Sequence, residues 1–298
     1  DLAGATTKAV MVGNKWVVNG QKVWTTSAHK AHWGLLLART DMDATKHDGL
    51  SYFIIDMKQP GVETQPLKQM NGYASFNQVF LTDAEVLPDF QVAELGDGWK
   101  VATTTLMHER RAADSLRAWG QVPDTDGPIY DQERAEVETT MAPYKWYPQR
   151  AGRVDLIMQR AKETGAIKDP AVRQEIAKLM TLHKSAEWTA RRARSAQEQG
   201  KPQGPEGSLG KLAASNVARA AAKVHTMISG ADSMLSGDDS PENGTVAEVL
   251  ISFPASSIAG GTDEIQKNII SERVLDMPKE TRFDAGKPFK DIPRNTIS

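Results

Sequence analysis

The segment Lys15-Trp-Val-Val-Asn-Gly-Gln-Lys-Val-Trp-Thr-Thr26 decides how the first third of the chain folds. Two β-rich runs flank Asn19-Gly20, and an Asn-Gly pair supplies the positive φ angles that a tight hairpin requires. No helical crossover fits between these runs and their neighbours, so the sequence predicts a mostly antiparallel sheet. Loops containing Asp, Gly and Pro separate the further strands that we expect, at 9–12, 33–39, 50–56 and 75–81.

After Gly96-Asp-Gly-Trp99 the pattern becomes helical, and a helix is predicted from about Trp99 through Trp119. Asp169-Pro170 predicts the start of another helix, because Asp can cap free amides and Pro is tolerated at the first helical position. The apolar spacing of this helix puts four side chains on one face: Val172, Ile176, Leu179 and His183.

A loop at 200–205 separates that helix from a second long, Ala-rich one. Its apolar positions are Leu212, Val217, Val224 and Ile228. Thr262 is predicted to cap a last helix reaching about Leu275, with two carboxylates in the first turn, where the helix dipole favours negative charge.

The composition is that of an ordinary globular protein, with 298 residues, 40% hydrophobic, 25% charged and a formal net charge of -2. The near-neutral charge argues against nucleic acid as a partner. The chain has no cysteine, which excludes disulfides and thiol chemistry and fits a reducing compartment, so we expect a cytoplasmic or, in a eukaryote, a mitochondrial-matrix protein. No apolar run is long enough to span a bilayer, and the six histidines lack metal-binding spacing.

Four segments in this order resemble the acyl-CoA dehydrogenase family of flavoenzymes: Asn19-Gly-Gln-Lys-Val-Trp-Thr-Thr-Ser27, Leu36-Leu-Ala-Arg-Thr-Asp41, Gly96-Asp-Gly-Trp99 and 258–273. The resemblance implies an α+β chain: a middle β domain at 1–95, a C-terminal antiparallel helical bundle at 96–278 and an extended tail at 279–298. The family's N-terminal helical domain and flavin loop are absent, so we expect a fragment or a chain whose missing wall a partner supplies.

The same resemblance implies a reaction and a catalytic base. Family members oxidise an acyl-CoA thioester between its α and β carbons, using a carboxylate as base and FAD as hydride acceptor. Gly260 stands where many members carry that carboxylate, whereas Glu109, followed by Arg110, matches the isovaleryl-CoA and long-chain branch, where the base comes from an earlier helix. By resemblance, the Gly260 amide donates to the thioester oxygen and Arg110 orders the substrate site. A solvated helix carboxylate is the other interpretation of Glu109.

Six further residues resemble the family's FAD contacts. Trp24 and Thr26 would lie against the flavin ring, on one face of a strand by alternation, with Ser27 following them. Thr262 and Glu264 match positions near the phosphates or adenosine, and a helix N-terminus suits a pyrophosphate. Arg160 stands where relatives place an arginine that reaches the FAD of a second subunit.

The partners implied are an acyl-CoA, an electron-transfer flavoprotein as acceptor, and a second copy in a homodimer or homotetramer. Two alternatives stay open: a non-catalytic subunit that requires a catalytic partner, and a flavin oxidase or nitroalkane-type enzyme on the same scaffold.

Overall fold

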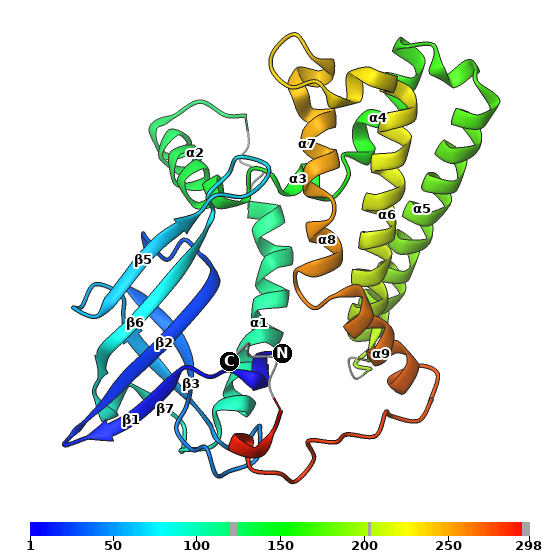
Figure 1. Cartoon of the computed structure of the whole chain (residues 1–298). Helices are drawn as coiled ribbons and strands as arrows, with labels where there is room; N and C mark the ends of the chain where they lie inside the picture. Colours follow the sequence, from blue (N-terminus) through cyan, green and yellow to red (C-terminus); the bar gives the residue numbers. More distant parts are fainter. Residues whose placement is uncertain (120–123, 202–203, 294–298) are drawn as a thin grey trace. The chain divides into compact units, whose positions relative to one another are not determined.

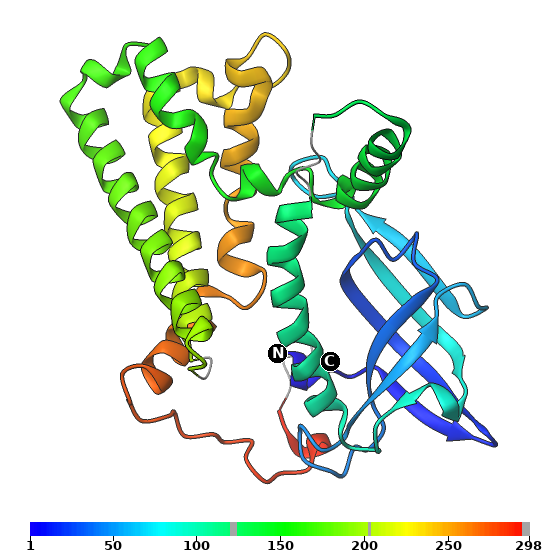
Figure 2. The same cartoon turned by 180° about the vertical axis from the view of Figure 1, so that it is seen from behind.

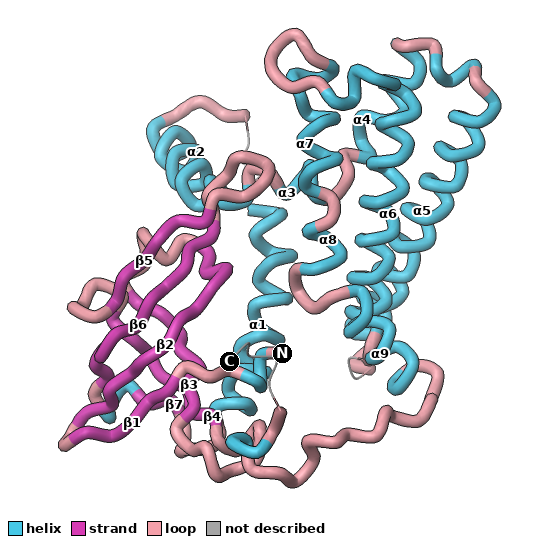
Figure 3. Tube along the Cα trace, viewed as in Figure 1, coloured by secondary structure: helices cyan, strands magenta, loops and turns pink. Residues whose placement is uncertain are grey.

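The computed structural model describes residues 1–119, 124–201 and 204–293, and within the helices it leaves the side chains of 110–119 and 206 undescribed. The chain forms two compact units. The first, the sheet unit, comprises Asp1–Gln69, Ala74–Tyr144 and Thr281–Ser298. The second, the helical unit, comprises Met70–Tyr73 and Lys145–Glu280. Figure 3 separates the strands of the one from the helices of the other by colour.

The sheet unit is built on one seven-stranded sheet in the order β5-β6-β2-β1-β3-β4-β7. Among the strands that the structure describes, only β1 and β3 pair in parallel, so the sheet is mostly antiparallel, as predicted. Strands β5 and β7 were not predicted from the sequence. The strands are β1 Lys8–Val12, β2 Lys15–Thr26, β3 Trp33–Arg39, β4 Leu50–Asp56, β5 Val62–Leu67, β6 Phe76–Val86 and β7 Gln91–Val92.

The predicted hairpin at Asn19-Gly20 is wrong: β2 runs unbroken through this pair, and the register against β6 shifts there instead. The Asn19 side chain exchanges two 2.9 Å hydrogen bonds with Asp83, one to its carboxylate and one from its backbone N–H. Gly20 has φ +151°, and a Cβ on it would lie 2.7 Å from the Thr7 hydroxyl. The glycine is therefore needed for a close approach within the sheet. The tight turn lies earlier, at Gly13, between β1 and β2.

Helix α1, Gly98–Trp119, has the predicted bounds to within one residue, and it belongs to the sheet unit. Its first turns pack on the sheet, because Ala102 is buried in a cluster with Leu37, Leu50 and Tyr52. Figures 1 and 2 show the helix alongside the strands. Helix α2, Pro128–Met141, follows it in the same unit. The last strand, β7, ends at Val92 and the first long helix begins at Gly98, whereas the compact units divide after Tyr144.

The tail after residue 279 makes specific contacts with the sheet unit rather than running free. Phe289 is buried, its backbone N–H donates to the Ala44 carbonyl at 2.9 Å, and the Arg39 guanidinium lies 3.3 Å from its ring centroid. Thr45 and Pro288 form a β-bridge beside it.

The helical unit is dominated by the pair α5 and α6, which Figure 1 shows side by side. Among the described residues, no helix is long and apolar enough to cross a membrane. The helices of this unit are α3 Tyr147–Arg150, α4 Val154–Glu163, α5 Pro170–Glu198, α6 Glu206–Ser229, α7 Thr245–Ser252, α8 Ala255–Ile258 and α9 Asp263–Arg273.

Helix α5 begins as predicted, with the Asp169 carboxylate accepting from the Ala171 N–H at 2.7 Å and Pro170 at the first position. Its predicted apolar face is buried at Val172, Ile176 and Leu179. His183, on the same face of the helix, is exposed. The buried stretch of α5 ends after Leu179, because the core of this unit gathers around the first three turns of α5.

Candidate functional site

The end of strand β2 presents Trp24, Thr26 and Ser27 on the surface of the sheet unit. Trp24 is 62% exposed and makes an edge-on contact with Phe76, whose ring centroid lies 5.7 Å away. Trp24 and Ser27 both have left-handed φ angles, +62° and +55°. The register against β6 shifts between Lys22 and Thr25, so simple alternation does not relate Trp24 to Thr26 as expected.

The Lys22 side chain connects this end of β2 to β3. Its ammonium donates to the Leu37 carbonyl of β3 at 2.7 Å, beyond the last pairing between β1 and β2. Burial lowers the pKa of Lys22 to about 8. The exposed Trp24 indole thus lies two residues after a lysine that is desolvated by burial.

Glu109 lies on α1, three turns after the helix begins, and its side chain is exposed. Thr105, one turn earlier, lines a hollow of about 210 Å³ together with Lys100, Val101 and Thr104. Residues four apart share a helix face, so Glu109 lies on the same face of α1 as Thr105, one turn beyond the hollow. The side chain of Arg110 is outside the described part of the structure.

The loop before α9 contains two adjacent left-handed glycines, Gly260 at φ +70° and Gly261 at φ +89°. Apart from its neighbours in the chain, no atom of the described residues lies within 4 Å of the position that a Cβ on Gly260 would take, so the loop leaves room there for a side chain. The buried Gln266 amide donates to both glycine carbonyls, at 3.4 and 3.3 Å. Gln266 was not predicted, although it follows the cap residue Thr262 by one helical turn.

The first turn of α9 is held to α6 by a buried carboxylate. Asp263 is 5% exposed and lies 3.4 Å from both Lys211 and Arg219. Burial alone would raise the pKa of Asp263, but hydrogen bonds from Ser215, Ser257 and Lys211 outweigh it and lower the pKa. The Thr262 hydroxyl accepts from the Ile265 N–H at 3.4 Å, which confirms the predicted cap, and Glu264 next to it is exposed.

Arg160 occupies another part of the helical unit. It is 6% exposed and contacts Ser229 at the end of α6 and Glu242. Asp263 meets α6 near Lys211, and Lys211 and Ser229 are eighteen positions apart, which corresponds to ~27 Å of helix. Figures 1 and 2 accordingly show α4 and α9 at opposite ends of α6. Within one chain the structure therefore brings Gly260, Thr262 and Glu264 together and leaves Arg160 apart.

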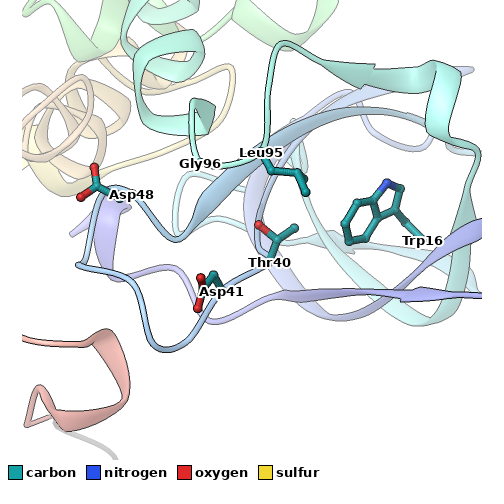
Figure 4. Close-up of a pocket in the computed structure, with 6 residues that line it drawn as sticks. All are labelled: Trp16, Thr40, Asp41, Asp48, Leu95 and Gly96. Atoms are coloured by element: carbon teal, nitrogen blue, oxygen red, sulfur yellow. The ribbon is translucent and has the colours of Figure 1, made fainter.

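A second hollow lies in the sheet unit, with a volume of about 230 Å³, and Figure 4 shows the side chains that line it. Trp16, Thr40, Asp41 and Leu95 are among them. None of the residues that line it is a predicted site residue.

Comparison with models of protein families identifies the family of this chain. The family model "Acyl-CoA dehydrogenase, middle domain" matches residues 1–84, and "Acyl-CoA dehydrogenase, C-terminal domain" matches residues 150–275. The chain belongs to the acyl-CoA dehydrogenase family. The resemblance inferred from the four sequence segments is confirmed, and so is the α+β fold of a mostly antiparallel sheet followed by a helical C-terminal region.

Two curated relatives from Mycobacterium tuberculosis match almost the whole chain. Acyl-CoA dehydrogenase IpdE1 is 32% identical over 95% of this chain, and acyl-CoA dehydrogenase FadE34 is 34% identical over 94%. The chain spans 65% of the length of the first and 34% of the second.

Solved structures show the same fold. The structure described as "Tcur3481-Tcur3483 steroid ACAD" has a TM-score of 0.74 at 23% identity, and 94% of this chain covers 65% of it. The ChsE4-ChsE5 complex from Mycobacterium tuberculosis has a TM-score of 0.67 at 23% identity, with 94% of this chain covering 66% of that one.

Proposed function

We propose that this chain is the larger part of an FAD-dependent acyl-CoA dehydrogenase that introduces a double bond between the α and β carbons of an acyl thioester. Membership of the family supports the reaction class. The flavin-ring contacts inferred by resemblance fit the structure, since Trp24, Thr26 and Ser27 stand accessible at the end of β2. FAD, when bound, supplies the acceptor for the β hydrogen and its electron pair.

The observation that carries the assignment of the base is the empty space at Gly260. A glycine with no side chain cannot remove a proton, so the α proton must go to a carboxylate from elsewhere. Glu109 is exposed on α1, beside a hollow lined by Thr105, and we assign it as that base. The Gly260 N–H would donate to the thioester oxygen, where negative charge develops as the proton leaves.

The assignment is tested by following flavin reduction under anaerobic conditions after addition of a panel of acyl-CoAs. We expect Glu109→Gln to keep bound FAD and to lose reduction by at least ~10³-fold, because the amide cannot accept the proton. Glu94→Gln, a change at an exposed carboxylate just before α1, is the matched control and should leave the rate unchanged. A Glu109→Gln enzyme that reduces its flavin at the normal rate would show that the base lies elsewhere.

A partner-requiring subunit is the second candidate. It is favoured by a structural neighbour that is itself a complex of two different proteins. FAD content per chain, measured together with the molecular mass in solution, separates the two candidates. A homodimer or homotetramer holding one FAD per chain supports the dehydrogenase proposal, with an electron-transfer flavoprotein as the proposed acceptor. FAD retained only with a different chain supports the second candidate.

A further inference from the structure

The C-terminal segment 284–291 lies on loop 40–49 of the sheet unit in the manner of a short added strand. The backbone N–H groups of Phe289 and Lys290 donate to two carbonyls of the loop, at 2.9 and 3.0 Å. When an extended peptide is recognised in this way, main-chain hydrogen bonds give affinity and pockets for its side chains give specificity. The contact between the tail and the loop therefore has the form of peptide recognition.

The side-chain pocket of this contact holds Phe289. The residue is 2% exposed, and the Arg39 guanidinium lies 3.3 Å from its ring centroid. Arg39 is equally buried and donates to three carbonyls, those of Ala3 at 2.7 Å, Ala5 at 3.1 Å and Lys46 at 3.2 Å. A cation over an aromatic face contributes most when both groups are removed from water. The pocket thus favours an aromatic residue, which it meets with a guanidinium already fixed in direction.

Ion pairs flank the pocket on both sides along the segment. Lys290, directly after the buried ring, pairs with Asp43 of the loop. Asp284, five residues before the ring, pairs with Lys46 at 3.3 Å, and its side chain is 11% exposed. A segment with the opposite order of charges would bring like charges together at both places. Charge matching therefore fixes the direction in which the segment binds.

The loop keeps its shape through hydrogen bonds of its own. The Gly49 N–H donates to the Thr45 carbonyl at 3.1 Å, and the Gly49 carbonyl accepts from the N–H groups of residues 40 and 41, at 3.0 and 3.2 Å. The Asp41 carboxylate accepts from the N–H groups two and three residues later, at 2.7 and 3.1 Å. A preformed site avoids the cost of ordering on binding, so the loop can receive the segment without being shaped by it.

The segment is joined to the preceding helix by an exposed linker. Every residue from 273 to 283 is exposed. Helix α9 belongs to the helical unit, whereas the segment belongs to the sheet unit. The residues after 275 also lie outside both family models that match the chain. The segment can therefore leave the loop and return to it without disturbing any buried part of the linker.

The same loop contacts the beginning of α1. The His47 and Trp99 rings lie 4.8 Å apart, centroid to centroid, and Trp99 is in the first turn of α1. The backbones also approach closely, because a Cβ on Gly96 would lie 2.8 Å from the Asp48 carbonyl oxygen. A contact that holds the loop in place thus also supports the residues from which α1 begins.

We propose that loop 40–49 and Arg39 form a peptide-docking site, and that its resident ligand is the C-terminal segment 284–291. The ligand class is an extended peptide with a carboxylate, an aromatic residue five positions later and an ammonium group directly after the aromatic residue. Filling the site holds the loop against the beginning of α1, and vacating it loosens both. The inference goes beyond the proposed dehydrogenase activity and does not depend on it.

Access to the site is measured by fluorescence anisotropy, with the full chain and a labelled synthetic peptide of residues 281–293. The chain's own segment competes, so the apparent dissociation constant of the peptide is its intrinsic value divided by the fraction of molecules with the site open. If the segment keeps the site closed nine times in ten, Phe289→Ala in the chain should strengthen peptide binding about tenfold. Phe283→Ala, at an exposed ring of the same tail, is the matched control and should leave the affinity unchanged.

A second peptide tests the pocket itself. It carries alanine in place of Phe289 and should bind the Phe289→Ala chain at least ~10-fold more weakly than the first peptide does, because a buried aromatic residue dominates such contacts.

Hydrogen exchange followed by mass spectrometry tests the link to α1. In the Phe289→Ala chain, the amides of 40–49 and 96–103 should lose protection, because the loop has lost its support. Adding the first peptide at saturating concentration should restore protection in both stretches. Peptides from α5, in the helical unit, should be unchanged throughout and serve as the internal control.

Three results would overturn the proposal: equal peptide affinity of the unmodified and Phe289→Ala chains, equal binding of the two peptides, or protection that the added peptide does not restore. Circular dichroism establishes that each variant is folded. Should Phe289→Ala fail to fold, Phe289→Leu keeps an apolar side chain in the pocket and removes the ring beneath the guanidinium. That variant should bind the first peptide more tightly than the unmodified chain does, and an unchanged affinity would count against the site. Flavin reduction enters none of these measurements, so their outcome is separate from that of the dehydrogenase assignment.

Discussion

The adjacent glycines before α9 offer a matched pair of substitutions, Gly260→Ala and Gly261→Ala. Both glycines are left-handed, at φ +70° and +89°, so an alanine is strained at either position. They differ in their surroundings. A Cβ at Gly260 meets nothing within 4 Å, whereas a Cβ at Gly261 would lie 2.6 Å from the Nε2 of Gln266.

The geometry gives different costs for the two variants. Left-handed strain costs about 1–2 kcal/mol for each alanine, partly offset by the smaller conformational freedom of the unfolded chain. Gly261→Ala must also push aside the Gln266 amide, which is 4% exposed and donates to two carbonyls. Leaving a buried amide unpaired costs about 1–3 kcal/mol. We therefore expect Gly261→Ala to destabilise this loop by about 1–3 kcal/mol more than Gly260→Ala does.

Hydrogen exchange, followed by mass spectrometry of peptides covering 254–275, reports the free energy of local opening at this loop. Repeating the comparison with Gln266→Ala present tests the cause, because Gly261→Ala should then cost no more than Gly260→Ala. Equal costs for the two variants in the unmodified background would refute the reasoning. So would a difference that persists without the Gln266 side chain.

Two further predictions concern the two units separately. Burial lowers the pKa of His225, which is fully enclosed, so below pH 6.5 the unfolded chain binds more protons than the folded chain does. The free energy of unfolding should therefore fall as the pH drops below 6.5. In urea titrations, His225→Asn should reduce this pH dependence, whereas His183→Asn, at an exposed histidine, should leave it unchanged. Phe289→Ala should destabilise the sheet unit by about 3–5 kcal/mol, because Phe289 is only 2% exposed and its ring packs against Arg39. Phe283 lies in the same tail but is 70% exposed, so Phe283→Ala should change thermal stability by no more than about 0.5 kcal/mol.

Local signals predicted those parts of the fold whose causes are local. The cap at Asp169, the following Pro170 and the cap at Thr262 were readable because each partner lies two or three residues away. The hairpin predicted at Asn19-Gly20 is wrong because a long-range contact outweighs the short-range preference of this pair for a turn. The Asn19 side chain hydrogen-bonds to Asp83, which lies 64 residues later.

The same distinction separates the site residues. Glu109 and Gly260 could be proposed from motifs, since each is recognised by its neighbours in sequence. The pairing of Arg160 with Glu242 could not, because the two residues are 82 positions apart and only the fold brings them into contact. Nor does the sequence show that Glu242 takes a left-handed backbone, because nothing about a glutamate favours that conformation.

The rigidity of the Gly260 loop must come from its supports rather than from the loop itself. A backbone N–H stabilises developing charge best when it is already aimed, so that no reorganisation is needed during the reaction. Glycine has the widest conformational choice of any residue, and two in succession would leave the Gly260 amide free to turn. The Gln266 amide donates to the carbonyls of both glycines, and Asp263 holds the same helical turn to α6 through Lys211. If Gly260 is the donor proposed here, then these two buried side chains, and not the glycines, set the direction in which its N–H points.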